Sequence, residues 1–438
     1  MIDKVSKIAD EIEENIVGYR RDFHRYAESG WTEFRTASLV ARRLTDLGYK
    51  VKVGREVMRE KDRMGLPSPQ ALEKHWQRAV TQGGDKEFLK AVRGGFTGVV
   101  GILENGKGPT VGMRFDMDAL DMQESKSPDH RPIKESFASI NDGVMHACGH
   151  DGHTATGLGV AKVLMKLKDQ VHGTVKLVFQ PAEEGVRGAK AMVSAGVVDD
   201  VDYMLAHHFF SGWKTGEITG GRNDHLATSK FDVTFTGTPA HAGGSPNEGK
   251  NALLAAATAV LNLYAIPRHR DGATRINVGR LDAGTGRNVI CAKAHLLVET
   301  RGSTTALNDY MYDYAIRVLE AAAQMHDCAL KVQAMGSAQS ANSDAELAER
   351  VEKIALEIGG FSIRPPKGGG GSEDYTYMME RVQNNGGLAT HIGVGAGLGN
   401  WGHHTAEFDI DENALKRAIK LLSLVTLDIT KRDQEQGK

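Results

Sequence analysis

Hydrophobic residues near the N-terminus recur at the spacing of an α-helix. Four of them are separated by three or four positions: Val5, Ile8, Ile12 and Ile16. This period predicts an amphipathic helix. A second helix is predicted from about Thr36 to Leu47, with Gly48 as its C-cap. The first 50 residues are therefore expected to be helical.

Between residues 98 and 208, short apolar segments end in polar loops and alternate with predicted helices. The apolar segments are GVVGIL (98–103), TVGMRFD (110–116), TVKLVFQ (174–180) and YMLAHH (203–208). Helices are predicted after Gly152 and near Ala189. This alternation is typical of an α/β fold with a mostly parallel sheet and helices on its faces.

A different order of elements is predicted for residues 223–334. The pattern indicates strand, helix, strand, strand, helix and strand, which is the order of a ferredoxin-like domain. The predicted segments are 229–237, 251–264, 274–281, 294–302, 305–326 and 329–335. We therefore expect a small α+β domain at this point in the chain.

The larger predicted domain consists of residues 1–222 and 335–438, because long amphipathic helices return near 344–358 and 412–427. An insertion is predicted in it at about residues 55–93, where charged residues and the sequence MGLPSP interrupt the α/β alternation. A helix is expected inside this insertion, from about Ala71 to Thr81.

Composition and charge exclude several classes of protein. The 438 residues carry 54 Lys and Arg against 56 Asp and Glu, and 40% are hydrophobic, so a large core is expected without the basic surface that nucleic-acid binding requires. Three cysteines are too few for a disulfide framework and favour a reducing compartment. The N-terminus lacks a signal-peptide core, and the longest apolar run, 252–266, is too short to cross a membrane. We expect a soluble cytoplasmic protein that binds neither nucleic acid nor membranes.

Polar clusters follow the predicted strands, where α/β sheets place their sites. They are MRFDMDAL (113–120), HACGHDGHT (146–154), QPAEEG (180–185), AHH (206–208) and HHTAEFDIDE (403–412). The second cluster holds three histidines, a cysteine and an aspartate, all residue types that bind transition metals. Because its Cys-x-His spacing matches no zinc-finger pattern, a catalytic metal site is favoured over a structural one.

The other clusters add carboxylates and imidazoles. Asp116 and Asp118 are two positions apart and share one face if the strand continues, although a solvated strand end is the alternative. Glu183 and Glu184 are expected to diverge in their turn, so that one binds metal and the other faces the attacking water; a solvated acidic turn is the alternative. Together the clusters suffice for two metal ions that polarise a carbonyl for hydrolysis.

The order of these motifs, with AHAGGSP (240–246) and GGSEDY (370–375), resembles the M20 family of metallo-amidohydrolases over nearly the whole chain. The resemblance is to the branch that hydrolyses N-acyl and indole-acetyl amino acids. It implies a zinc-exopeptidase-like α/β fold with an inserted ferredoxin-like domain that acts as a lid and dimerisation surface. Residues 20–37 and 55–69 are similar to a subfamily that cleaves p-aminobenzoyl-glutamate.

The resemblance also implies roles for individual residues. The implied metal ligands are Cys148, His150, Glu184, His208 and His404. Cys148 stands where related peptidases have a bridging aspartate, Glu183 is the implied general base, and Asp118 is expected behind the ligands. His208 is preferred to His207 by its distance from Gly216, and His404 to His403 by its distance from Phe408. The implied cofactors are two divalent ions, Mn²⁺ or Zn²⁺.

Three residues of the inserted domain match the family pattern. His241 is implied to steady the oxyanion in the site of a partner copy of the chain, while Asn288 and Arg301 hold the substrate carboxylate. Without the resemblance, a turn asparagine and a surface salt bridge would be the preferred interpretations. In the implied reaction, Glu183 passes a proton from the attacking water to the leaving amine. A homodimer is expected, and a hetero-oligomer with a second, related chain is an alternative.

The expected reaction is hydrolysis of p-aminobenzoyl-glutamate to p-aminobenzoate and glutamate. Hydrolysis of acetyl-, benzoyl- or indole-acyl amino acids is the first alternative, and the segment 55–93 argues against it. A metal-binding paralogue without activity is the second, and it is disfavoured because Glu183 is present. The glycine run 368–371 would let the backbone approach a substrate closely, or would simply form a flexible turn.

Overall fold

The structure, a computed structural model, describes residues 1–365, 371–399 and 401–431. Most of the glycine run 368–371, and with it the expected close approach to a substrate, lies outside the described residues. The chain divides into two compact units. The larger unit is Met1–Asn223, Asn342–Gly368 and Tyr377–Lys438, and the smaller unit is Asp224–Ala341 and Gly369–Thr376.

The described part of the larger unit forms an eight-stranded sheet in the order β1-β2-β4-β3-β5-β12-β6-β11. Its strands are β1 (Lys50–Val53), β2 (Val99–Asn105), β3 (Thr110–Asp116), β4 (Gly173–Gln180), β5 (Tyr203–Phe210), β6 (Glu217–Thr219), β11 (Ser362–Ile363) and β12 (Leu388–Gly395). The central strands β4, β3, β5 and β12 run parallel to one another, as do β11 and β6. The pairs β1–β2, β2–β4 and β12–β6 are antiparallel. The predicted α/β fold with a largely parallel sheet is confirmed.

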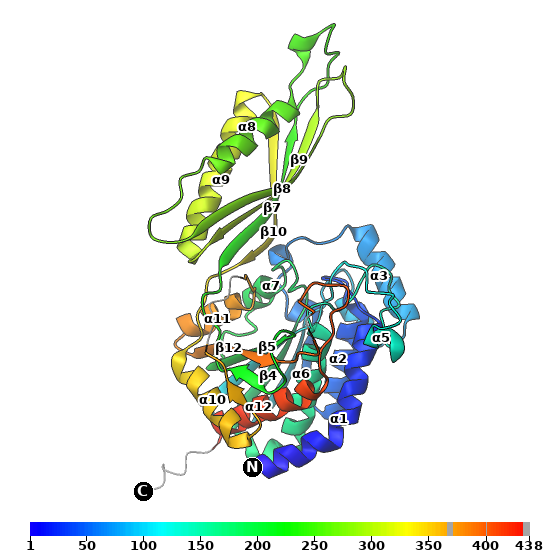
Figure 1. The fold of residues 1–438 in the computed structure, drawn as a ribbon, viewed down its shortest axis with the longest axis vertical. Coiled ribbons are helices and arrows are strands. Elements are labelled where there is room, and N and C mark those ends of the chain that lie inside the picture. Colours follow the sequence, from blue (N-terminus) through cyan, green and yellow to red (C-terminus); the bar gives the residue numbers. More distant parts are fainter. Residues whose placement is uncertain (366–370, 400, 432–438) are drawn as a thin grey trace. The chain divides into compact units, whose positions relative to one another are not determined.

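Helices pack against this sheet and against one another (Figure 1). They are α1 (Ile2–Arg25), α2 (Phe34–Leu47), α3 (Pro69–Thr81), α4 (Phe88–Val92), α5 (Arg131–Lys134), α6 (His150–Lys166), α7 (Ala189–Ser194), α10 (Ala345–Ile358), α11 (Thr376–Asn384) and α12 (Asn413–Ile429). Short 3-10 turns occur at Gly54–Glu56, Glu60–Asp62 and Lys168–Gln170. Helix α6 contacts β3, β4 and β5, and α1 and α12 pack on α6.

The predicted N-terminal helices are confirmed. Val5, Ile12 and Ile16 of α1 are buried, and α2 ends at Gly48, whose φ of +95° is the left-handed conformation expected of a C-cap. The helix expected near 71–81 is α3, where Ser68 accepts a hydrogen bond from the Ala71 N–H (3.2 Å).

The start of α6 differs from the prediction, because the helix begins at His150 rather than after Gly152. Gly152 is not a helix breaker here but a point of close packing, since a Cβ at this position would lie 2.6 Å from Cδ1 of Ile410. The chain turns at Gly149, which has a φ of +90°. His150 is thereby placed in the first turn of the helix.

The smaller unit has the predicted β-α-β-β-α-β order. Its elements are β7 (Ala227–Thr236), a 3-10 turn (Pro246–Glu248), α8 (Ala252–Tyr264), β8 (Thr274–Ala283), β9 (Lys293–Gly302), α9 (Thr305–Met325) and β10 (Ala329–Ala338). The strands form an antiparallel sheet in the order β10-β7-β9-β8, and both helices lie on one face of it (Figure 1).

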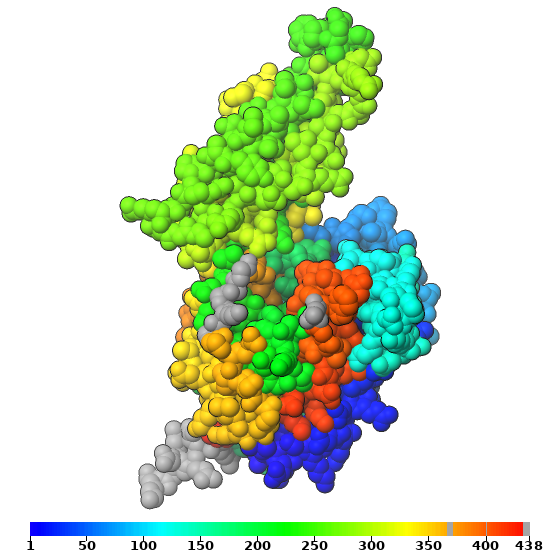
Figure 2. Space-filling view, viewed as in Figure 1, coloured from blue at the N-terminus to red at the C-terminus, as the bar shows by residue number. Residues whose placement is uncertain are grey.

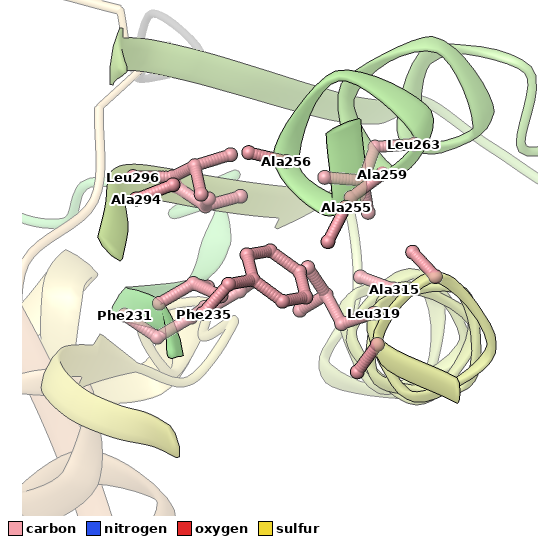
Figure 3. Packing of buried hydrophobic residues seen from close by; sticks show 14 of the residues in the cluster. Phe231, Phe235, Ala255, Ala256, Ala259, Leu263, Ala294, Leu296, Ala315 and Leu319 are labelled. Carbon is pink, nitrogen blue, oxygen red and sulfur yellow. The ribbon is translucent and has the colours of Figure 1, made fainter. Parts of the chain in front are cut away.

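The core of the smaller unit fills the space between this sheet and its two helices. Phe231 and Phe235 of β7 face alanines of α8 and Leu319 of α9 (Figure 3). The alanines at positions 255, 256 and 259 are fully buried, and their small side chains allow α8 to lie close to the strands. Within the described residues, no helix combines the length and apolar character needed to cross a membrane.

Candidate metal centre

The predicted clusters meet at one edge of the sheet. Strands β3, β4 and β5 are neighbours and run parallel, so their carboxyl ends point the same way. Asp118 follows the end of β3, Glu183 and Glu184 follow the end of β4, and His208 lies near the end of β5. The parallel centre of the sheet therefore brings together residues that are up to 90 positions apart.

Three buried donors form the first group. The Sγ of Cys148 and ring nitrogens of His150 and His208 lie within 4.8 Å of one another, and the Cys148 Sγ is 3.5 Å from the His208 Nε2. Donor atoms about 2.0–2.3 Å from a common ion have separations of this size. The group therefore has the residue types and the spacing of a transition-metal site.

Two further groups share these donors. Cys148, Glu184 and His404 form one, in which the His404 Nε2 lies 3.3 Å from the Glu184 Oε1. His150, Glu183 and Glu184 form the other. Because Cys148, His150 and Glu184 each belong to two of these three groups, the donors make one continuous cluster that contains all five predicted ligands.

The two glutamates do not diverge as expected. One carboxylate oxygen from each of Glu183 and Glu184 lies within 4.8 Å of the other and of a His150 nitrogen. The turn is unusual because Ala182 has a φ of +51°, a conformation that non-glycine residues rarely adopt. Asp118 holds it, since its Oδ1 accepts from the Glu183 N–H and its Oδ2 from the Glu184 N–H, both at 2.9 Å.

The ring nitrogens of the histidines are oriented by the backbone. The Nδ1 of His150 lies 2.9 Å from the Asp118 carbonyl oxygen, and the Nδ1 of His208 lies 2.8 Å from the Phe209 carbonyl oxygen. Each Nδ1 must carry a proton to make these bonds, so Nε2 is the ring nitrogen that remains for a metal ion. Both rings are thus held as metal ligands are held.

His207 and His208 point to opposite faces of β5, as adjacent strand residues do. The His207 ring packs against Phe115, His153 and Phe209, and neither of its nitrogens has a hydrogen-bond partner in the described residues. Burial lowers the pKa of His207 well below its ordinary value, so the ring is neutral. Of this doublet, only His208 joins the donor cluster.

In the second histidine doublet, His403 and His404, both rings lie near the donor cluster. A backbone bond from the His404 N–H to the Ala147 carbonyl oxygen (2.9 Å) ties this loop to the segment that contains Cys148. His404 belongs to a donor group, yet the Nδ1 of His403 also lies 3.7 Å from the Cys148 Sγ. Both imidazoles therefore approach the thiol.

Asp116, His150 and His153 form a fourth buried group, in which both ring nitrogens of His153 are already hydrogen-bonded within the protein. The His153 Nδ1 lies 2.6 Å from Asp116, and its Nε2 accepts from the Phe209 N–H at 2.9 Å, so neither nitrogen is available to a metal. Asp116 also accepts from Arg114 at 2.5 Å. Although burial alone would raise it, the pKa of Asp116 lies well below its usual range because of Arg114, His150 and His153.

Protons occupy the cluster when no metal is bound. Burial and then the Glu184 carboxylate raise the pKa of the Cys148 thiol. Hydrogen bonds to Cys148 and to Glu184 raise the pKa of His404 to about 10. A metal ion needs a thiolate and neutral imidazoles, so its binding must release these protons.

The charged insertion contacts the turn that carries the glutamates. The Arg187 Nε donates to the Glu184 carbonyl oxygen (2.8 Å), and its Nη1 donates to the Gly65 carbonyl oxygen (3.3 Å). Trp31 Nε1 donates to the Met64 carbonyl oxygen at 2.7 Å. A Cβ at Gly30 would lie 2.3 Å from Nη2 of Arg187, so a larger residue at this position would displace the end of the Arg187 side chain.

The predicted residues of the smaller unit are His241, Asn288 and Arg301, and each makes contacts within that unit. His241 is exposed, and its Nδ1 accepts from the N–H groups of Gly243 (3.1 Å) and Gly244 (2.9 Å). The Ala242 N–H donates to the Asn288 carbonyl oxygen (3.0 Å), which places His241 and Asn288 on neighbouring segments. Arg301 donates to Glu299 at 3.0 Å.

Sequence reasoning missed Glu33 and Arg20 as parts of the site's support. Both are fully buried. Glu33 accepts from the Ala182 N–H, and Arg20 pairs with Asp151, which follows His150. An acid before a helix and an arginine on an amphipathic helix are usually solvated, so no local signal could have found them.

The comparisons with known proteins agree with this geometry. The model of peptidase family M20/M25/M40 matches residues 112–428. The chain is 46% identical over 430 residues to a p-aminobenzoyl-glutamate hydrolase subunit of Escherichia coli (strain K12), covering 98% of each chain. It is 49% identical over 413 residues to indole-3-acetyl-aspartic acid hydrolase of Enterobacter agglomerans, covering 94% of each.

A solved structure gives the same result. The aminobenzoyl-glutamate utilization protein from Klebsiella pneumoniae superposes with a TM-score of 0.84 and 42% identity, covering 97% of this chain and 98% of that chain. The predicted family and fold are confirmed, and the hydrolase relatives favour an enzyme over the alternative of an inactive paralogue.

Proposed function

Because the chain belongs to peptidase family M20/M25/M40 and is an amidohydrolase of N-acyl amino acids, we propose that its substrate is p-aminobenzoyl-glutamate. The products are p-aminobenzoate and glutamate. The full-length likeness to the p-aminobenzoyl-glutamate hydrolase of Escherichia coli carries this proposal. The insertion at residues 55–93 lies beside the proposed site, because the Arg187 Nη1 donates to the Gly65 carbonyl oxygen.

Indole-3-acetyl-aspartate is the second candidate substrate, since the similarity to its hydrolase covers 94% of each chain. Both compounds join an aromatic acyl group to an amino acid with an acidic side chain. We therefore place the substrate in that chemical class and rank p-aminobenzoyl-glutamate first within it.

We propose two divalent ions, Mn²⁺ or Zn²⁺, as cofactors, with Cys148, His150, Glu184, His208 and His404 as ligands. The donor set fits them, since the His150 Nε2 is buried and has no hydrogen-bond partner in the described residues, and the Glu184 Oε1 lies beside the His404 Nε2 at 3.3 Å. Sulfur, nitrogen and carboxylate donors together suit zinc, and the carboxylates also suit manganese. When bound, the ions supply Lewis-acid polarisation of the amide carbonyl.

The protein supplies the proton transfers and the positioning. Glu183 takes a proton from the attacking water and delivers it to the leaving amine. The Nδ1 of His241 accepts two backbone N–H bonds, so its Nε2 carries the proton and can donate to the oxyanion. Asn288 and Arg301 bind the substrate carboxylate, to which a guanidinium can pair through two hydrogen bonds.

The test compares kcat/KM for p-aminobenzoyl-glutamate, indole-3-acetyl-aspartate, benzoyl-glycine and acetyl-amino acids with added Mn²⁺ or Zn²⁺. The assays are run with and without a second, related chain, and metal content is measured in parallel. We expect p-aminobenzoyl-glutamate to be preferred. A preference of about tenfold for another substrate, equal to about 1.4 kcal/mol in transition-state binding, would show that the substrate proposal is wrong.

A further inference from the structure

The carboxyl group of Glu33 is fully buried and makes its hydrogen bonds far away in the sequence. Glu33 immediately precedes helix α2 but makes no side-chain bond to the end of that helix. Its Oε1 accepts from the Ala182 N–H at 2.8 Å, and its Oε2 accepts from the Thr97 hydroxyl at 2.7 Å. A residue placed to cap its own helix is instead directed to the turn after β4.

This bond completes a row of three backbone contacts to buried carboxyl groups. The N–H of Ala182 donates to Glu33, and the next two N–H groups, of Glu183 and Glu184, donate to Asp118. All three contacts act on a backbone that is strained at Ala182, with its φ of +51°. Such a conformation persists only where its surroundings hold it.

We propose that Glu33 is a positioning residue for the reaction: by holding the Ala182 N–H, it sets the direction in which Glu183 presents its carboxylate. This inference rests on the proposed role of Glu183 as general base. Asp118 fixes the turn from the side of β3, and Glu33 fixes it from the loop before α2. Loss of either support would let the turn relax from its strained form.

The protonation of Glu33 suggests a conservative replacement. Burial and then the nearby Asp118 carboxylate raise the pKa of Glu33 to about 8, so the side chain is mainly neutral at pH 7. Glu33 accepts both bonds, from the Ala182 N–H and from the Thr97 hydroxyl. In glutamine the amide oxygen can accept from the Ala182 N–H, and the amide NH₂ group can donate to the Thr97 oxygen once that hydroxyl rotates. Glutamine should therefore preserve both contacts, whereas leucine removes both and aspartate is too short to span them.

The experiment compares Glu33→Gln, Glu33→Leu and Glu33→Asp, each loaded with metal. The matched control is Glu28→Leu, because Glu28 is an equally buried carboxyl whose bonds go to the N–H groups of Arg35 and Thr36 in α2. Glu33→Leu and Glu33→Asp should lower kcat by about 10–100-fold, as small misplacements of a reacting group do. KM, bound metal and the kcat of the control should stay within about threefold of wild type.

Hydrogen–deuterium exchange of peptides covering residues 180–187 gives a readout that is independent of turnover. Exchange should be faster in Glu33→Leu and Glu33→Asp, and unchanged in Glu33→Gln and Glu28→Leu. The proposal is overturned if kcat survives in Glu33→Leu, if Glu33→Gln is as damaged as Glu33→Leu, or if the loss of kcat follows metal loss. If wild type turns over no substrate, the proposed function is wrong. If exchange is unchanged in Glu33→Leu, Glu33 does not hold the turn, whatever the outcome of the activity assays.

Discussion

Individual residues of the site hold the predicted metal ligands in fixed orientations through hydrogen bonds within the protein. His150 and His208 each donate a hydrogen bond from Nδ1 to a backbone carbonyl oxygen, so that Nε2 is directed toward Cys148 and its neighbours. The Asp118 carbonyl oxygen accepts from the His150 ring, and the Asp118 carboxylate accepts from the N–H groups of Glu183 and Glu184. One residue therefore orients both a predicted ligand and the predicted general base.

The two adjacent glutamates are expected to have separable roles. Glu183→Gln should retain the bound metal but lower kcat by at least the ~10²–10⁴-fold typical of a general acid–base group. Glu184→Gln should lose metal, because Glu184 lies within 4.8 Å of donors from Cys148 and His404. Elemental analysis and steady-state kinetics measure the two effects. Equal metal loss in both variants would contradict the assignment.

The doublet of His207 and His208 provides a second contrast on one strand. His208→Ala should lose metal, because its Nε2 lies 3.5 Å from the Cys148 Sγ. His207→Leu should keep the metal and should leave the free energy of unfolding unchanged or raise it by about 1 kcal/mol, since it removes buried nitrogens that lack partners in the described residues. Metal loss in His207→Leu would reverse the assignment.

At the scale of elements, helix α1 joins the segments that carry the predicted ligands. Arg20 of α1 is fully buried and pairs with Asp151 (2.8 Å) in the first turn of α6. It also pairs with Asp409 (2.6 Å) and Glu412 (3.3 Å), which precede α12. Segments 121–140, which includes α5, and 401–412 lie side by side at the surface of the larger unit, as the cyan and orange-red parts of Figure 2 show. The Ser125 N–H donates to the Ala406 carbonyl oxygen (2.9 Å).

His24 makes this ionic network sensitive to pH. Burial alone would lower its pKa, but hydrogen bonds to Asp151 and Glu124 raise the pKa of His24 to about 9. Its protonated form therefore stabilises the fold fully below about pH 6.5, and this stabilisation is lost as the pH rises through about 9. The shift corresponds to about 3 kcal/mol in the free energy of unfolding.

Wild type and His24→Gln are compared by urea unfolding between pH 6.5 and pH 10. Tryptophan fluorescence reports on the larger unit alone, because all four tryptophans (Trp31, Trp76, Trp213 and Trp401) belong to it. The stability difference between the two proteins should shrink by about 3 kcal/mol as the pH rises. A difference that does not change with pH would exclude His24 as the titrating group.

At the scale of the whole molecule, the smaller unit has its own sheet and its own hydrophobic core. It also carries His241, whose backbone contacts leave Nε2 as a donor. An independent core allows such a unit to serve as a lid or a dimerisation surface without disturbing the larger unit. These roles remain predictions from the family resemblance.

A mixing experiment tests whether His241 acts on a neighbouring copy of the chain. His241→Ala and Glu183→Gln proteins should each be inactive alone, and hybrid dimers should recover one competent site in two. An equal mixture that exchanges freely should then show about a quarter of wild-type activity. Differently tagged copies confirm the exchange. If purified hybrids have no activity, His241 does not act between the two copies.

The sequence alone determined the elements and the chemical character of the site. The spacing of Val5, Ile12 and Ile16 predicted α1, and the alternation around β7 predicted a half-buried strand, because these patterns depend on neighbours within one or two turns. The motif HACGHDGHT indicated a metal site because the residue types themselves carry that chemistry. The order of motifs identified the family, which the comparisons confirm.

Only the tertiary structure decided which side chains converge and how they are held. Glu183 and Glu184 were expected to diverge, but Asp118, 65 positions before Glu183, binds both of their N–H groups and keeps the carboxylates together. Glu33 reaches Ala182 across 149 positions, and Arg20 reaches Asp151 across 131. A buried carboxyl or guanidinium is stable only with partners, and when those partners come from distant segments, the folded sheet alone brings them within hydrogen-bond distance.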